Sequence, residues 1–385
     1  MKKLRVGIIY GGRSGEHEVS VASAAAIFKH LDRERYEPIP IRIEKDGRWT
    51  IADRPPVALA AAEVIEQARV QGAHAARPGR SAHMLPYPSE ERLLTIDRSR
   101  APESHENAHV TGLGLDVVFP VLHGPYGEDG TVQGLLELAN IPYVGAGVLA
   151  SAVGMDKAVM KIVFAARGLP IVPYRVVLRH EWSGHERAAA SALADALGFP
   201  MFVKPANLGS SVGISKAGTH GALIAAIELA LEYDRKVVVE LAVPDAREIE
   251  CALLGNDEPA ASVAGEIVPN REFYDYEAKY LDNGAELRIP APLADEHHAE
   301  IRRMAVEAFR AIDGAGMARV DFLVERGSGR TYVNEINTIP GFTTISMYAK
   351  LWAASGVPYP ALLERLIELA VDRHTDKQRL KTSVL

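Results

Sequence analysis

The first thirty residues limit the class of fold most strongly. An apolar run at residues 4–10 ends at Gly11-Gly12 and is followed by a helical pattern of small residues from Val19 to Phe28. A strand, a glycine turn and a helix in this order form the opening unit of an α/β sheet domain. The apolar run is too short for a signal peptide and soon meets charged residues, so we interpret it as a buried strand.

Strand and helix patterns continue along the whole chain and predict a mixed α/β (α+β) protein of three units. We expect an N-terminal domain at 1–147 on a doubly wound parallel sheet, a central domain at 148–240 and a C-terminal domain at 241–385. An insertion at about 53–110 is expected to be partly helix and partly loop. The expected strands span residues 4–10, 38–43, 116–122, 141–144, 171–178, 200–204, 236–240, 247–254, 262–268, 317–324 and 330–336, and the expected helices span 19–28, 131–139, 156–167, 186–197, 220–232, 295–312 and 358–372.

The bulk composition narrows the function classes. The 385-residue chain has a formal net charge of −7, which disfavours general nucleic-acid binding because phosphate affinity needs clustered Lys and Arg. No stretch approaches the roughly 18–20 apolar residues of a membrane span. The single cysteine, Cys251, precludes an intramolecular disulfide. That fits a cytoplasmic protein, with a secreted cysteine-poor protein as the alternative.

A lysine and a glycine-serine loop follow one another at residues 204–213. Lys204 ends an expected strand, and the turn after it contains Gly209, Ser210, Ser211 and Gly213. Glycines allow consecutive N–H groups to converge on an anion, and the serines add hydroxyl donors. We interpret the loop as a phosphate cradle without a Walker A motif, and the alternative is a mobile hairpin turn.

Residues 145–150 match the dinucleotide-binding pattern G-x-G-x-x-A. The acidic residue expected about 20 positions later does not end a second strand, because residues 157–167 have a helical pattern. We therefore favour a tight turn entering a helix over a dinucleotide-dependent oxidoreductase. Lys157 on that helix is a second candidate phosphate partner.

Polar residues alternate with apolar ones on two expected strands near the C-terminal end of the chain. Glu335 and Asn337 project from one face of a strand, and Asp321 can meet them from an antiparallel neighbour. Two carboxylates and an amide are hard oxygen ligands suited to Mg²⁺. The alternative is a solvated polar face. Arg319 lies on the same face as Asp321 and could stabilise developing negative charge.

The loop 273–280 is richer in tyrosine and charge than a connector requires. It reads Phe-Tyr-Asp-Tyr-Glu-Ala-Lys-Tyr, and it could form a lid from which Lys279 reaches a phosphate. The alternative is an exposed loop with packed tyrosines.

Together these segments resemble the ATP-grasp superfamily and, within it, the D-alanine–D-alanine ligases. The resemblance extends over nearly the whole chain, with six motifs in the order of the family. They are the segment Gly11 to Ser20, the segment His123-Gly-x-x-Gly-Glu128-Asp129-Gly, Met155-Asp-Lys157, the Lys204 to Gly213 loop, the tyrosine-rich loop ending at Tyr280, and Asn334-Glu-Ile-Asn-Thr-x-Pro-Gly341.

The resemblance implies three α/β domains that grip ATP between the central and C-terminal ones. Lys157, Lys204 and Lys279 would contact phosphates, and the loop Gly209–Ser211 would fold over them. Glu240 and the backbone from Leu241 to Val243 would hold adenine, and Glu248 the ribose. Asp321, Glu335 and Asn337 would hold two Mg²⁺ ions, for which Mn²⁺ could substitute.

The resemblance also implies a two-step ligation through an acyl phosphate. Glu16 would pair with the ammonium of the first D-alanine and His123 would lie near its carboxylate. Arg319 and the Gly341 N–H would stabilise the tetrahedral oxyanion. Ser346 and the Met347 N–H would receive the carboxylate of the second D-alanine.

The family further implies a cytoplasmic homodimer that acts on ATP and D-alanine in peptidoglycan precursor synthesis, and so in cell-wall biogenesis and cell shape. Three alternatives remain: a D-alanine–D-lactate ligase, a ligase of other D-amino acids, and a nucleotide-binding protein without ligase activity. Tyr280 favours the dipeptide, because D-lactate relatives carry histidine in that region. In the family this tyrosine closes the lid against residues matching Glu16 and Ser210.

Substitution of Tyr280 tests this lid. We expect Tyr280→Phe to lower kcat and raise KM for the second D-alanine, because the hydroxyl that bonds to Glu16 and Ser210 is lost. Steady-state kinetics over D-alanine concentration measures both constants. Values equal to those of the unsubstituted protein would contradict this lid role.

Overall fold

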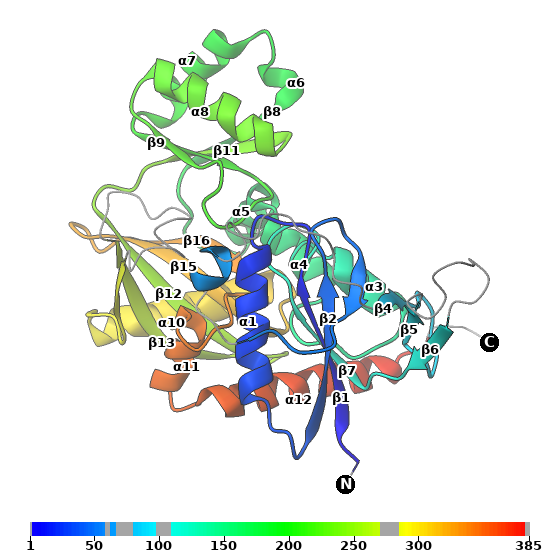
Figure 1. Ribbon diagram of the computed structural model, residues 1–385. Helices are drawn as coiled ribbons and strands as arrows, with labels where there is room; N and C mark the ends of the chain where they lie inside the picture. The colour runs from blue at the N-terminus through cyan, green and yellow to red at the C-terminus, as the bar shows by residue number, and fades with distance from the viewer. Residues whose placement is uncertain (1, 58–61, 67–79, 98–108, 270–284, 382–385) are drawn as a thin grey trace.

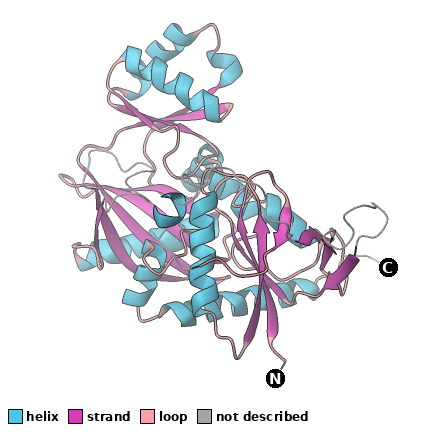
Figure 2. Ribbon diagram, in the orientation of Figure 1, coloured by secondary structure: helices cyan, strands magenta, loops and turns pink. Residues whose placement is uncertain are grey.

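The computed structural model describes residues 2–57, 62–66, 80–97, 109–269 and 285–381, and it contains three separate β-sheets (Figures 1 and 2). The sheets follow one another along the chain, as the sequence predicts. Lys279 and Tyr280 lie outside the described residues.

The N-terminal sheet has a parallel centre and an antiparallel extension. Strand β1 (Leu4–Gly11) lies between β2 (Tyr36–Ile43) and β7 (Val117–Val121), parallel to both. From Val6 onward β1 is buried. Its Val6, Ile8 and Tyr10 side chains pack in one cluster with helix α1 (His17–His30) and α12 (Tyr359–Gln378), and Ile9 packs in a second cluster on the other face. Helix α3 (Thr131–Leu138) follows β7. This confirms the predicted opening unit.

The predicted content of the insertion was wrong in part. Residues 62–66 are helical, but the segment also supplies β4 (Arg80–Met84) and β5 (Leu93–Asp97), and β6 (His109–Leu113) begins within it. With β3 (Trp49–Ile51) these strands extend the sheet in antiparallel order from β2. Each has at most five residues, too few for a clear alternation. The strand expected at 141–144 is a single bridge between Val118 and Tyr143.

The central sheet is a small antiparallel unit with its own core. Its strand order is β10 (Ser215–Ala217), β9 (Met201–Pro205), β11 (Lys236–Leu241) and β8 (Tyr174–Leu178). Helices α6 (Arg179–Trp182), α7 (Glu186–Leu197) and α8 (His220–Tyr233) accompany it, and the apolar side chains of α7 and α8 share one cluster with the strands. In Figure 1 this unit stands apart at one end of the molecule.

The third sheet is antiparallel and carries the predicted polar strands. Its order is β14 (Ala285–Arg288), β13 (Ala260–Pro269), β12 (Ala246–Gly255), β15 (Gly316–Glu325) and β16 (Thr331–Asn337). Helix α10 (Asp295–Ala311) packs on one face, together with α4 (Val148–Met155) and α5 (Lys157–Ala166). Helix α11 (Met347–Ala354) packs on the other face beside β12 and β13.

The two ends of the chain share one apolar core. Side chains of β1, α1 and β7 pack with those of α11 and α12 in a single buried cluster. Arg373 of α12 donates to the carbonyl of Gly145 and, at 3.1 Å, to that of Tyr143, and it stacks on the Tyr143 ring. The N-terminal and C-terminal units are therefore joined by a core, whereas the central unit has its own. The domain boundaries at 147 and 240 stay a prediction.

Candidate active site

The glycine-serine loop bridges the central and N-terminal units. It follows β9, and Ser210 and Ser211 both have left-handed backbone angles, with φ of 52° and 59°. The hydroxyl of Ser210 donates to Glu16 Oε1, and a Cβ built on Gly209 would come within 2.9 Å of Glu16 Oε2. Glycine is therefore needed at 209 for the loop to approach Glu16 so closely. The expected proximity of Ser210 to Glu16 is present.

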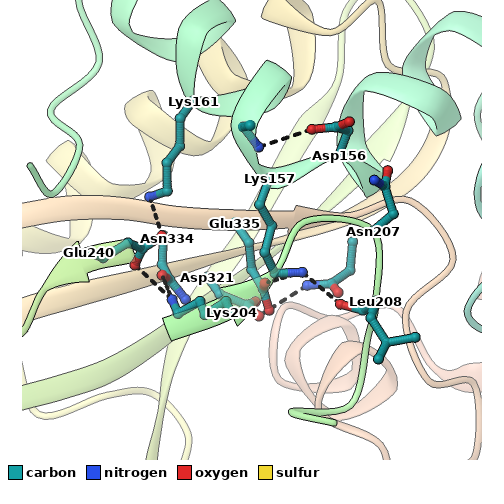
Figure 3. A network of polar contacts seen from close by, with 12 residues as sticks. Asp156, Lys157, Lys161, Lys204, Asn207, Leu208, Glu240, Asp321, Asn334 and Glu335 are labelled. Atoms are coloured by element: carbon teal, nitrogen blue, oxygen red, sulfur yellow. Dashed lines mark hydrogen bonds and ion pairs between the residues drawn. The ribbon is translucent and has the colours of Figure 1, made fainter. Parts of the chain in front are cut away.

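Two buried lysines converge on one buried carboxylate (Figure 3). Lys204 Nζ lies 2.8 Å from Glu240 Oε2, and Lys161 Nζ lies 3.0 Å from Glu240 Oε1. Burial alone would raise the pKa of Glu240, but the charges of Lys161 and Lys204 outweigh it and lower this pKa to about 2. Lys204 also donates to Asn334 Oδ1 at 3.3 Å, which ties the central sheet to β16.

Lys161 was not among the predicted site residues. It lies one helical turn after Lys157 on α5, so the i, i+4 spacing placed it on the same helix face. Burial lowers its pKa, and the charge of Glu240 opposes that shift. The Glu240 side chain, expected at adenine, here contacts lysines. In the segment expected to hold adenine, Leu241 to Val243, the Leu241 N–H donates to the Pro173 carbonyl and the Ala242 N–H to the Pro200 carbonyl.

Lys157 connects the loop to the polar face of the third sheet. Its Nζ donates to the Leu208 carbonyl at 2.8 Å and lies 3.6 Å from Glu335 Oε2 (Figure 3). Asp156 caps α5 by accepting from the N–H groups of Ala158 and Val159, which fixes the helix end that carries Lys157. The predicted position of Lys157 beside the phosphate loop is therefore present.

The predicted polar face is formed by paired residues of β15 and β16. Asp321 lies opposite Glu335, and Arg319 opposite Asn337. Arg319 makes two hydrogen bonds to Asp321, of 2.6 and 2.7 Å, and Asn337 Nδ2 donates to Asp321 at 3.0 Å. These contacts confirm the antiparallel pairing inferred from the sequence.

A register shift after Asp321 brings one more polar residue to this face. Asp321 pairs with Glu335 but Phe322 pairs with Val333, so Asn334 is an extra residue on β16. Such a bulge re-aims a side chain at a strand edge. Asn334 can therefore reach Lys204 while Glu335 keeps its contact with Lys157.

Glu250 on β12 was also not predicted. It lies in register with Asp321, and its Oε2 is 3.1 Å from Arg319 Nε. Burial would lower the pKa of Arg319, but Asp321 and Glu250 hold it well above its ordinary value. Glu248 lies two residues earlier on the same strand face, and its charge contributes to raising the pKa of Lys204. The period-2 pattern Glu248-x-Glu250 was the available sequence signal.

The oxygen donors on this face fit a hard divalent cation. Asp321, Glu335 and Asn337 supply two carboxylates and an amide from adjacent strands, the ligand type that Mg²⁺ prefers. In the described part of the chain no three His, Cys, Asp or Glu side chains gather as a metal site. A metal here would therefore use the amide and other oxygen ligands in addition to the two carboxylates.

The substrate side of the site is built from α1 and the loop after β7. Glu16, immediately before α1, is buried, and Ser14 Oγ donates to the His123 carbonyl at 2.7 Å. His123 Nδ1 is 3.0 Å from the carbonyl of Ile339, and its Nε2 is 3.2 Å from Ser23 Oγ. Burial lowers the pKa of His123, so the ring is neutral near pH 7.

Glu128 is a third residue whose role the sequence analysis did not assign. Its carboxylate accepts from the N–H groups of Gly124 and Ile339, at 2.6 and 3.3 Å. Burial, reinforced by the charge of Glu16, raises its pKa to about 8. It thus joins the loop after β7 to the segment after β16.

The expected residues for the second substrate lie together at the start of α11. Ser346 precedes the helix, and its hydroxyl contacts the Thr343 N–H at 3.0 Å and Thr343 Oγ1 at 2.7 Å. Met347 is the first helical residue, and its side chain is buried. Gly341 lies beside Ser346, since a Cβ at 341 would approach Ser346 Oγ to 3.3 Å.

One cavity of about 50 Å³ lies where these groups meet. All three sheet units contribute to its walls, so segments that are distant in the sequence meet there. The walls include Glu128, Lys157, Gly209, Ser210, Glu335, Asn337 and Thr338. This space is smaller than a usual small-molecule pocket.

The lysine–carboxylate cluster predicts a pH-dependent stability. Because the pKa of Glu240 is lowered to about 2, its stabilisation is complete above the ordinary carboxyl pKa and is lost as pH falls through about 2. We expect Glu240→Gln to destabilise the protein by about 3–5 kcal/mol at pH 7, because two buried cations lose their partner. At pH 3 the two proteins should differ less in their free energy of unfolding.

Urea unfolding of both proteins at pH 7 and pH 3 measures this effect. Glu37→Gln is the control, because Glu37 and its partner Arg5 are well exposed and such pairs contribute at most about 1 kcal/mol. Removing one cation in a Glu240→Gln/Lys161→Met variant should restore part of the loss. If Glu240→Gln lowered the free energy of unfolding equally at pH 7 and pH 3, the ionised state assigned to Glu240 would be contradicted.

Comparison with known proteins identifies the family of the chain. Residues 5–146 match the family model described as D-ala D-ala ligase N-terminus, and residues 163–368 match D-ala D-ala ligase C-terminus. The chain is 51% identical to the D-alanine--D-alanine ligase of Solibacter usitatus, over 98% of both chains. It is 49% identical to that of Heliobacterium modesticaldum, over 100% of this chain and 99% of the relative.

Solved structures show the same likeness. The D-alanine-D-alanine ligase from Coxiella burnetii has a TM-score of 0.80 and 36% identity, covering 98% of this chain and 97% of its own. VanG D-Ala:D-Ser ligase from Enterococcus faecalis also has a TM-score of 0.80, with 32% identity, covering 96% of this chain and 100% of its own. The fold is therefore the ATP-grasp fold, and the chain belongs to the D-alanine–D-alanine ligase family.

Proposed function

We propose that this protein uses ATP to join two D-alanine molecules into D-alanyl-D-alanine, in the synthesis of peptidoglycan precursors. The observation that carries the proposal is the contact of Ser210 with Glu16 directly beside the polar face of β15 and β16. The cavity is lined by the phosphate-binding loop and by the oxygen ligands Glu335 and Asn337, and Ser210 of that loop bonds to Glu16, the carboxylate that would bind the ammonium. An enzyme that transfers phosphate to a small amino acid needs these three together.

For the nucleotide, we assign the phosphates to Lys157, Lys204 and the loop Gly209–Ser211. Lys279 would reach them from the lid. Glu240 fixes Lys161 and Lys204, while the backbone from Leu241 to Val243 would hold adenine and Glu248 the ribose. Lysines aimed by a buried carboxylate lose little conformational freedom on binding, which favours this assignment.

Asp321, Glu335 and Asn337 would hold two Mg²⁺ ions, with Mn²⁺ as a substitute. When bound, these ions would neutralise charge on the phosphate oxygens. The bidentate bonds from Arg319 hold the Asp321 carboxylate in one orientation, which supports its use as a ligand.

In the first step, a carboxylate oxygen of the first D-alanine attacks the γ-phosphorus, and ADP leaves. This converts a poor electrophile into an acyl phosphate. The amine of the second D-alanine then attacks the carbonyl carbon and loses a proton, and phosphate leaves. Glu16 would hold the first ammonium and His123 would lie near that substrate's carboxylate. Arg319 and the Gly341 N–H would stabilise the tetrahedral oxygen.

The second D-alanine would place its carboxylate at Ser346 and at the Met347 N–H. This N–H belongs to the first turn of α11, where backbone donors lack partners within the helix and favour an anion. D-alanine is the favoured second substrate because the relatives that align with the full chain at 49–51% identity are named D-alanine--D-alanine ligase.

Two further assignments complete the proposal. None of the described helices is long and apolar enough to cross a membrane, and we place the protein in the cytoplasm. The family resemblance supports a homodimer, which light scattering of the purified protein would test.

Phosphate release and product mass test the function. With ATP, Mg²⁺ and D-alanine we expect one phosphate per D-alanyl-D-alanine, no turnover after chelation, and recovery with Mg²⁺ or Mn²⁺. D-serine and D-lactate should yield little mixed product in competition with D-alanine. Phosphate release without a dipeptide, or preferred coupling to D-lactate, would contradict the proposal.

Substitution of Arg319 tests the oxyanion assignment. Arg319→Lys keeps the charge but loses the planar pair of donors, so we expect kcat to fall by about 10²-fold. Arg326→Lys, at an exposed pair with Asp245, is the matched control and should leave kcat unchanged. Similar kcat values for the two variants would refute the role of Arg319.

A further inference from the structure

The segment Ile339–Phe342 is fixed at both ends by side chains from elsewhere in the chain. The Ile339 N–H donates to Glu128, and its carbonyl accepts from His123. The Phe342 N–H donates to Ser23 Oγ at 3.3 Å, and its carbonyl accepts from the Tyr359 hydroxyl at 2.7 Å. Gly341 lies between these two anchored peptides.

The hydrogen bonds of Ser23 and His123 run in one direction. Because Nδ1 faces the Ile339 carbonyl, Nδ1 must carry the hydrogen, and Nε2 must then accept. Its donor is the Ser23 hydroxyl, whose oxygen in turn accepts from the Phe342 N–H. The chain of bonds thus begins at Phe342 and ends at Ile339 of the same segment. Bonds aligned in this way strengthen one another.

The location of Ser23 on α1 connects this chain of hydrogen bonds to Glu16, the carboxylate assigned to the first substrate. Ser23 is fully buried on α1, seven residues after Glu16. Glu16 is the N-cap residue of α1, and Ser23 lies on the same helix. Helix α1 and its N-cap therefore carry both the carboxylate assigned to the first substrate and the anchor of the segment that contains Gly341.

We propose that Ser23 and His123 are positioning residues that hold the Gly341 N–H in register with Glu16. The proposal rests on the proposed function, in which this N–H stabilises the tetrahedral oxygen. A donor acts on that oxygen only at hydrogen-bond distance, so a small displacement of the segment lowers the rate of ligation. Both ring nitrogens of His123 are bonded within the protein, so His123 acts through the segment and not by a bond to the substrate carboxylate.

The first test is Ser23→Ala. This variant loses the acceptor for the Phe342 N–H and the donor to His123. We expect kcat to fall about 10-fold or more, while KM for ATP changes less than about twofold because the lysines and β11 are untouched. Ser262→Ala is the matched control. Ser262 on β13 is equally buried, and its hydroxyl accepts the Ala252 N–H at 3.0 Å and donates to the Val263 carbonyl at 2.7 Å.

The second test separates positioning from direct substrate contact. His123→Asn keeps a donor near the Ile339 carbonyl but removes the acceptor for Ser23. If the two residues act as one unit, Ser23→Ala/His123→Asn should be no slower than the worse single variant. If His123 contacts the substrate itself, the two losses will multiply and His123→Asn will raise KM for D-alanine, which would overturn the proposal.

Thermal unfolding and product mass complete the design. A Ser23→Ala protein that loses only as much thermal stability as Ser262→Ala, yet has a lower kcat, supports the positioning role. An unchanged kcat, or a fall matched by Ser262→Ala, would overturn it while wild-type ligation still stands. If the unsubstituted protein forms no dipeptide, the proposed function fails first. If Ser23→Ala does not fold, His123→Asn provides the same kcat comparison.

Discussion

The Glu240 carboxylate is the interaction on which the nucleotide side of the molecule depends. It is buried and receives Lys161 from α5 and Lys204 from β9, and Lys204 continues to Asn334 on β16. Two buried cations without this carboxylate would strongly oppose folding. One acidic group therefore ties β9 and β11 of the central sheet to helix α5, and through Lys204 to Asn334 of the third sheet.

The sequence was sufficient to predict local features and motifs. Helix α7 and the pairing of Asp321 with Glu335 agree with the residue pattern, because period and spacing act over short distances. Strands β4–β6 were missed, since each is short and half-exposed and is stabilised by its neighbours in the sheet. Tertiary contacts overrode weak local signals there.

The site was predictable in its ligand types but not in its internal support. Asp321, Glu335, Ser210 and Glu16 carry chemistry that a motif reveals, and all lie together. Glu250 and Ser23 act by contacts across strands or across more than 300 residues of chain. No spacing rule gives such long-range partners. Spacing within one element did mark two of the missed residues, because Lys161 lies one helical turn after Lys157 and Glu250 lies two residues after Glu248.

The core shared by the first and last segments has a consequence for biosynthesis. Strand β1 and helix α1 leave the ribosome early, but α12, which completes their core, is made near the end of translation. The central unit, with a contiguous chain and its own core, can fold while synthesis continues. The apolar side chains of β1, α1 and β7 that pack against α12 therefore stay exposed until several hundred further residues have been synthesised. The nascent chain should depend on chaperones most before α12 emerges.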